Sequence, residues 1–169
     1  MAKSKAWYEP LMAVLRLPSK VLMALNCGSF TLALPPPVTW RSCSAPTMVV
    51  APKHHSAPET GALAKTASGA LERQPYLRVT NLAEAMADLK AMGFTLIGLE
   101  GEATVTLAEA VASVGGRPIG LVLGAEGPGL REKTRESCDI LARIPYAGGF
   151  GSLNVSNAAA VSLYAASRG

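Results

Sequence analysis

The chain contains few aromatic residues, few charged residues and few cysteines. Of its 169 residues, 5% are aromatic and 17% are charged, whereas 49% are hydrophobic. The cysteines, Cys27, Cys43 and Cys138, are scattered and odd in number, without a Cys-x-x-Cys pair. This pattern argues against a disulfide framework and against a zinc site, and it fits a protein of the reducing cytoplasm.

The chain also lacks an apolar run long enough to cross a bilayer, so no membrane partner is expected. Arg16, Pro18 and Lys20 interrupt the first apolar stretch, which argues against a secretory signal. His54 and His55 have no carboxylate or cysteine placed to complete a metal site, so a solvated loop is favoured there. The net charge of +4 permits a polyanionic partner without requiring one.

Residues 1–47 contain little regular pattern, because prolines interrupt every apolar run. We predict that they form a poorly ordered extension ahead of one domain, residues 48–169. Two alternatives remain for this segment. Residues 11–25 could form a short amphipathic helix broken by Pro18, and the basic, acid-poor composition could belong to a targeting peptide.

From residue 47 onward, short apolar stretches alternate with helical patterns. Strands are predicted at residues 47–51, 76–79, 94–99 and 118–123. Helices are predicted at residues 59–71, after Thr80 or Asn81 as far as Gly93, from Thr106, and at residues 154–167. This alternation predicts an α/β fold with a mostly parallel sheet covered by helices on both faces.

Two segments near the end of the chain, residues 121–130 and 144–156, share one organisation. In each, an apolar strand runs into glycines, and small polar residues then begin a helix. The glycines of the first segment follow neither the dinucleotide fingerprint nor the P-loop, and Ser152 lacks the frame of a hydrolase elbow. We therefore expect a nucleotide-like ligand held by main-chain groups at the carboxyl ends of strands.

These segments resemble the second and third motifs of the SpoU/TrmH family of RNA ribose 2′-O-methyltransferases, within the SPOUT superfamily. The matching residues are Gly124-x-Glu126-Gly127-x-Gly129-Leu130, then Ile144-Pro145, then Ser152-Leu153-Asn154-Val155-Ser156. The resemblance extends from about Val49 to the C-terminus, and the nearest subgroup methylates a guanosine in large-subunit ribosomal RNA. It implies S-adenosylmethionine as cofactor, ribosomal RNA as substrate, and a deep trefoil knot at the C-terminal end.

The resemblance assigns Gly124, Ile144 and Leu153 to cofactor binding. Gly124 has no side chain to obstruct a ligand, while Ile144 and Leu153 offer apolar walls and backbone amides. Without the motifs, core packing would be the preferred role of Ile144 and Leu153.

The implied reaction moves a methyl group from a sulfonium to a ribose 2′-hydroxyl, so the protein mainly orients the reactants and polarises the hydroxyl. The resemblance makes Glu126 and Asn154 catalytic candidates, and Lys53 and Ser152 candidates for contact with the substrate. Two alternatives are structural. Glu126 could brace its loop through backbone amides, which we favour, and Asn154 could cap the last helix together with Ser152.

The family's first motif, approximately Asn-x-Gly-x-x-x-Arg-Thr-Ala, has no counterpart. Asn26-Cys27-Gly28 begins like it, but Leu32 stands where the arginine that acts on the ribose hydroxyl is expected. Arg41 is the nearest substitute. We hypothesise that the segment before Val49 is out of frame or scrambled relative to an ordinary family member.

The last predicted helix carries a stripe of small and apolar residues, Val155, Ala159, Leu163 and Ala166. The resemblance implies that this helix builds a homodimer, whereas simple packing onto the sheet is the alternative. Two other functions also remain open: a knotted relative that has lost catalysis or only binds RNA, and an unrelated nucleotide-binding α/β enzyme.

Overall fold

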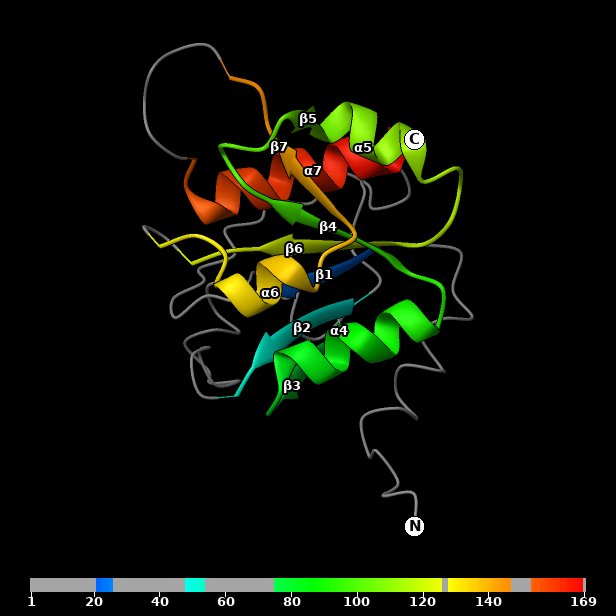
Figure 1. Ribbon diagram of the computed structural model, residues 1–169, viewed down its shortest axis with the longest axis vertical. Coiled ribbons are helices and arrows are strands. Elements are labelled where there is room, and N and C mark those ends of the chain that lie inside the picture. The colour runs from blue at the N-terminus through cyan, green and yellow to red at the C-terminus, as the bar shows by residue number, and fades with distance from the viewer. Residues whose placement is uncertain (1–20, 26–47, 54–74, 126–127, 147–152, 169) are drawn as a thin grey trace.

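The computed structural model describes residues 21–25, 48–53, 75–125, 128–146 and 153–168, with only the backbone described for residues 21–25 (Figure 1). Within these residues a parallel sheet has the strand order β3-β2-β1-β6-β4-β7-β5. The strands are β1 Val21–Leu25, β2 Met48–Pro52, β3 Tyr76–Val79, β4 Thr95–Leu99, β5 Val105–Thr106, β6 Ile119–Leu123 and β7 Ile140–Arg143. The helices are α4 Leu82–Ala91, α5 Leu107–Ser113, α6 Glu132–Glu136 and α7 Val155–Arg168.

Side chains of the central strands alternate between two hydrophobic clusters. Leu121 and Leu123 of β6 pack with α5 and α7, whereas Val122 packs with α4. The neighbouring strand β4 divides in the same way, with Ile97 on the first side and Leu96 on the second. Helices therefore cover both faces of the sheet, as Figure 1 shows, and the predicted parallel α/β architecture is confirmed.

Two of the predicted helix starts are confirmed by their caps. The carboxamide oxygen of Asn81 accepts a hydrogen bond from the backbone N–H of Glu84 at 3.4 Å, and α4 begins there. Thr106 and Glu109 form a capping box at the start of α5, with the Glu109 carboxylate 2.8 Å from the Thr106 backbone nitrogen. Hydrogen bonds from the Thr106 side chain and backbone hold the pKa of Glu109 below its usual value.

Strand β1 corrects the expectation for the N-terminal segment. Residues 21–25 lie between β2 and β6 and pair with both strands, so the helix considered over residues 11–25 is wrong for these five residues. A continuous run of five apolar residues fits a buried strand as well as a helix, and partners distant in sequence decide between them. The domain boundary after residue 47 stays a prediction.

Several predictions concern residues outside the described ranges. The helix at residues 59–71 is one of them, and the trefoil knot also stays a prediction because residues 147–152, which lead into α7, are not described. Among the helices of the described residues, none is both long and apolar enough to cross a membrane.

Candidate functional site

A cavity of about 610 Å³ opens where the carboxyl ends of β4, β6 and β7 meet the start of α7. Because these strands are parallel neighbours in the sheet, the loops that follow them lie at one edge. The described residues that line the cavity are 99–102, 123–125, 128–130, Ile144, Tyr146, 153–155 and Ala158. The described parts of the loops after β4, β6 and β7 therefore meet in one cavity.

The loop after β6 closes on itself. Ala125 and Gly129 exchange two backbone hydrogen bonds, each 3.0 Å long. A Cβ atom on Gly124 would lie 2.2 Å from the carbonyl carbon of Gly129, and Gly129 itself has a φ of +67°. Both glycines are thus required by the loop geometry.

The loop gives Gly124 a structural reason that the sequence did not show. The space that a side chain would need is filled by the backbone of Gly129 and Leu130, so glycine is needed for loop closure. Its role in leaving room for a ligand stays a prediction. Gly101, which also lines the cavity, has no heavy atom within 4 Å of an added Cβ. The described contacts therefore require a glycine at position 124 but not at position 101.

The three residues assigned to cofactor binding, Gly124, Ile144 and Leu153, line this one cavity. They come from the loop after β6, the end of β7 and the start of α7, and are brought together by the fold. Ile144 is half-buried and also packs against the α5–α7 cluster, so a packing role coexists with its place in the wall. Their role toward a ligand stays a prediction.

Asn154 lies in the cavity wall and caps α7. Its carboxamide oxygen accepts a hydrogen bond from the Ser156 backbone N–H at 2.8 Å, and its carbonyl accepts one from Ala158 at 2.9 Å. The predicted capping role of Asn154 is thus confirmed, whereas the share of Ser152 in the cap and a catalytic role of Asn154 stay predictions. Glu126, Ser152 and Arg41 lie outside the described residues.

Lys53 is exposed immediately after β2 and is not part of the cavity wall. Its backbone N–H donates to the carbonyl of Val79 at 2.8 Å, and its own carbonyl accepts a hydrogen bond from the Arg78 guanidinium. Strand β1 separates β2 from β6, which puts Lys53 roughly 10 Å from the cavity's nearest strand, along the same edge of the sheet.

Two acidic residues of the cavity wall, Glu100 and Glu102, were not singled out from the sequence. The Glu100 carboxylate lies 3.2 Å from the Arg135 guanidinium, and the backbone N–H of Glu100 donates to the carbonyl of Ala142 at 3.0 Å. The signal in the sequence that could have identified them is their position just after the apolar run that forms β4. Arg135 is exposed on α6.

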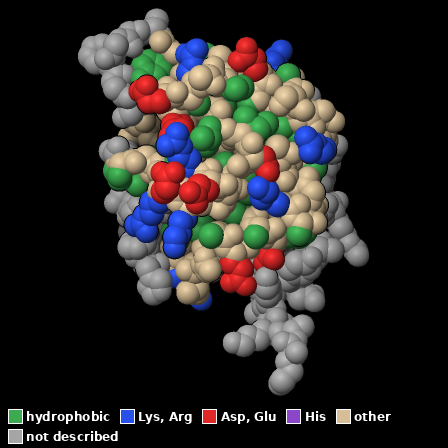
Figure 2. Space-filling view, viewed as in Figure 1, with side chains coloured by type: hydrophobic (Ala, Val, Ile, Leu, Met, Phe, Trp, Pro, Cys, Tyr) green, Lys and Arg blue, Asp and Glu red, His purple; other side chains and the backbone are tan. Residues whose placement is uncertain are grey.

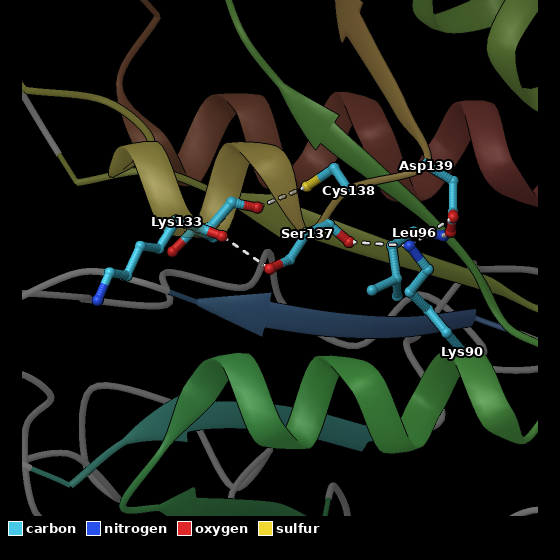
Figure 3. A network of polar contacts seen from close by, with 7 residues as sticks. Lys90, Leu96, Lys133, Ser137, Cys138 and Asp139 are labelled. Atoms are coloured by element: carbon cyan, nitrogen blue, oxygen red, sulfur yellow. Dashed lines mark hydrogen bonds and ion pairs between the residues drawn. The ribbon is translucent and has the colours of Figure 1, made fainter.

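A polar network joins α4, β4 and the turn before β7 (Figure 3). Asp139 accepts a hydrogen bond from the Leu96 backbone N–H at 2.8 Å and forms an ion pair with Lys90 at 2.7 Å. The Lys90 ammonium also lies 3.3 Å from the carbonyl of Ser137. This network fixes β4 and β7, whose carboxyl ends form part of the cavity.

Cys138 packs against the hydrophobic cluster on the α4 side of the sheet. Its thiol donates to the carbonyl of Thr134 at 3.2 Å, and an added Cβ on Gly98 would lie 2.8 Å from the sulfur. Burial raises the pKa of this thiol to about 11, with a smaller contribution from the negative charge of Asp139. The thiol is therefore a packing group and a poor nucleophile at neutral pH.

Comparison with known proteins identifies the family. The family described as the SpoU rRNA Methylase family matches residues 39–164. The 23S rRNA (guanosine-2′-O-)-methyltransferase RlmB of Vibrio parahaemolyticus is 44% identical over 120 residues, which are 71% of this chain and 47% of that protein. The RlmB of Xanthomonas campestris is 48% identical over 122 residues, or 72% of this chain and 48% of the relative. The chain thus spans about half the length of these relatives.

Solved structures agree in fold. The SpoU methyltransferase AviRb from Streptomyces viridochromogenes, in complex with AdoMet, has a TM-score of 0.73 at 22% identity, covering 93% of this chain and 63% of that one. An AdoMet-bound rRNA methyltransferase from Sinorhizobium meliloti has a TM-score of 0.72 at 20% identity, covering 88% and 56%. With the motifs and the parallel α/β fold described above, these matches show that the chain belongs to the SpoU rRNA methylase family.

Proposed function

We propose that this chain binds S-adenosylmethionine in the cavity and transfers its methyl group to a ribose 2′-hydroxyl of ribosomal RNA. The observation that carries the proposal is the meeting of Gly124, Ile144 and Leu153 in one cavity at the carboxyl ends of parallel strands. Family membership and the names of the RlmB relatives support the reaction. The alternative of an unrelated nucleotide-binding enzyme is wrong, because the family is established.

The cavity suits the proposed cofactor in size and lining. Ligand sites usually measure about 300–1,000 Å³ and are mostly apolar with a few polar groups, and the observed volume of about 610 Å³ falls in this range. Leu99, Ile144 and Leu153 offer half-buried apolar surfaces for an adenine ring. Backbone groups of the strand-end loops provide donors and acceptors for its edges.

The cofactor supplies an already activated methyl group on a sulfonium, so the residues of the chain have to hold and orient the reactants. We assign the shape of the binding loop to Gly124 and Gly129, which permit its closure. Asn154 positions the start of α7 against the cavity through its cap. Glu126 is proposed to brace the loop or accept the hydroxyl proton, and Arg41 to polarise the hydroxyl.

RNA contact is proposed at the rim of the cavity, with Lys53 and Ser152 as the candidate residues. On the face shown in Figure 2, basic and acidic side chains of the described residues are interspersed and form no continuous basic surface. Lys53 lies on the same sheet edge as the cavity, where a phosphate could be contacted. The cytoplasmic location follows from the proposed substrate and stays a prediction.

We also propose the C-terminal trefoil knot and a homodimer. The stripe Val155, Ala159, Leu163 and Ala166 is buried within the chain itself, so the packing alternative holds for it. A dimer would therefore use the outer side of α7, where Val161 and Tyr164 are 43% and 61% exposed. Exposed large apolar side chains on one helix favour such a contact.

The function is tested with methyl-labelled S-adenosylmethionine and unmodified large-subunit ribosomal RNA, followed by mapping of the 2′-O-methyl group. We expect transfer to a guanosine ribose by the wild-type chain, and a loss of at least about tenfold in the Arg41→Ala variant. Arg131→Ala, an exposed arginine outside the cavity wall, serves as the matched control. Cofactor binding without any transfer would contradict the catalytic proposal, and the alternative of impaired catalysis has no support from the comparisons.

A further inference from the structure

The charge of the cavity is opposite in sign to the charge of the chain. Among the described residues of its wall, the charged side chains are Glu100 and Glu102, and both are acidic. The whole chain has a net charge of +4. An acidic lining in a basic protein points to a ligand that carries positive charge where it meets this wall.

The position of Glu100 is fixed from two directions. Its backbone N–H donates to the carbonyl of Ala142 on β7, and its carboxylate lies 3.2 Å from the guanidinium of Arg135 on α6. The side chain of Glu100 is 23% exposed, whereas that of Arg135 is 44% exposed. The carboxylate is therefore held at a defined place instead of moving freely in solvent.

Only one member of the ion pair belongs to the cavity wall. Glu100 lines the cavity, and Arg135 does not. Of the two charged residues of the pair, the negative one therefore belongs to the cavity wall. Glu102, two residues further along the same wall, adds a second carboxylate that is exposed to solvent.

We propose that Glu100, positioned by Arg135, makes this cavity select a cationic cofactor over its neutral product. This inference rests on the proposed function, in which S-adenosylmethionine is the donor. The donor carries a net positive charge from its sulfonium, and S-adenosylhomocysteine, which remains after methyl transfer, is neutral overall. A fixed carboxylate in the wall stabilises the donor complex more than the product complex, and so favours exchange of product for donor.

The test is calorimetric titration of the full chain with three ligands: S-adenosylmethionine, S-adenosylhomocysteine and sinefungin. Sinefungin has a protonated amine at the place of the sulfonium, so it reports on charge without a transferable methyl group. In Glu100→Gln, we expect the Kd of both cationic ligands to rise about three- to fivefold, with the Kd of S-adenosylhomocysteine unchanged. Added salt should reduce the donor's advantage in the wild type and have less effect in the variant.

Glu136→Gln is the matched control, since it removes the same charge from an exposed position of α6 outside the cavity wall. It should leave all three affinities unchanged. Equal weakening of the three ligands in Glu100→Gln, or no change in any of them, would overturn charge selection while leaving the proposed function intact. A wild-type chain that binds none of the three ligands would overturn both proposals.

Discussion

The two helix layers of this protein cover the same sheet but are built from different side chains. The α4 side packs large residues, among them Met86, Leu89 and Phe94, and the Lys90–Asp139 ion pair connects it to the turn before β7. The α7 side packs mainly alanines, valines and leucines, and the first turn of α7 lines the cavity. The comparison indicates that the α4 layer anchors the strands, whereas the α7 layer completes the ligand site.

The largest effect is expected from Leu89→Ala, which empties a core position that is 1% exposed. It should lower the free energy of unfolding by about 2–5 kcal/mol, measured by denaturant titration, because a buried leucine leaves a cavity. S-adenosylmethionine should still bind with unchanged Kd under conditions where the chain is folded. Leu163→Ala, the matched change on α7, should destabilise the chain and also weaken binding of S-adenosylmethionine. Equal Kd values in the two variants would contradict the different roles of the α4 and α7 layers.

Gly124→Ala tests the closed loop directly. An added Cβ at 2.2 Å from the Gly129 carbonyl carbon forces the backbone apart, so we expect a stability loss of about 1–3 kcal/mol and loss of cofactor binding. Gly101→Ala lies in the same cavity wall but meets no atom within 4 Å, and it should bind the cofactor nearly as the wild type does. If both variants bind equally well, the loop is not the binding element.

Asp139→Ala separates the two contacts of the network in Figure 3. Removing the carboxylate leaves the Leu96 backbone N–H without this acceptor, which should reduce stability by about 1–2 kcal/mol. Asp139→Asn keeps an acceptor and loses only the ion pair with Lys90, a partly exposed pair worth about 0–1 kcal/mol. In thermal unfolding, Asp139→Asn should therefore have a higher Tm than Asp139→Ala. The reverse order would contradict the assigned contacts.

A pH-dependent effect is expected from Cys138 at alkaline pH. Its pKa is raised in the folded chain to about 11, so the unfolded chain loses the thiol proton first. The contribution of this thiol to stability is complete below an unfolded-state pKa of about 8.5 and is lost as pH rises toward 11. The stability difference between the wild type and Cys138→Ala should thus shrink over that range, and a difference that grows with pH would contradict the burial of the thiol.

The sequence predicted the elements whose signals are local. Continuous apolar runs predicted β2, β4 and β6, and the polar residues Asn81 and Thr106 predicted the starts of α4 and α5. Strand β1 was not predicted, because its place depends on pairing with β2 and β6, far away in the chain.

The sequence also predicted part of the candidate site. The motifs located Gly124, Ile144 and Leu153, which share one cavity, but the reason for a glycine at position 124 appeared only when Gly129 was seen to occupy the neighbouring space. Glu100 was missed since its significance depends on Arg135, which approaches it only in the folded chain. Contacts between distant residues are therefore what the sequence could not supply.

The most direct measurement of the central proposal is the shift of backbone amide NMR signals during titration with S-adenosylmethionine. We expect large changes at Gly124, Ile144 and Leu153 and in residues 99–102, with little change along α4. Absence of shifts at these amides under saturating cofactor, or shifts concentrated in α4, would contradict a main-chain cofactor site at this edge of the sheet.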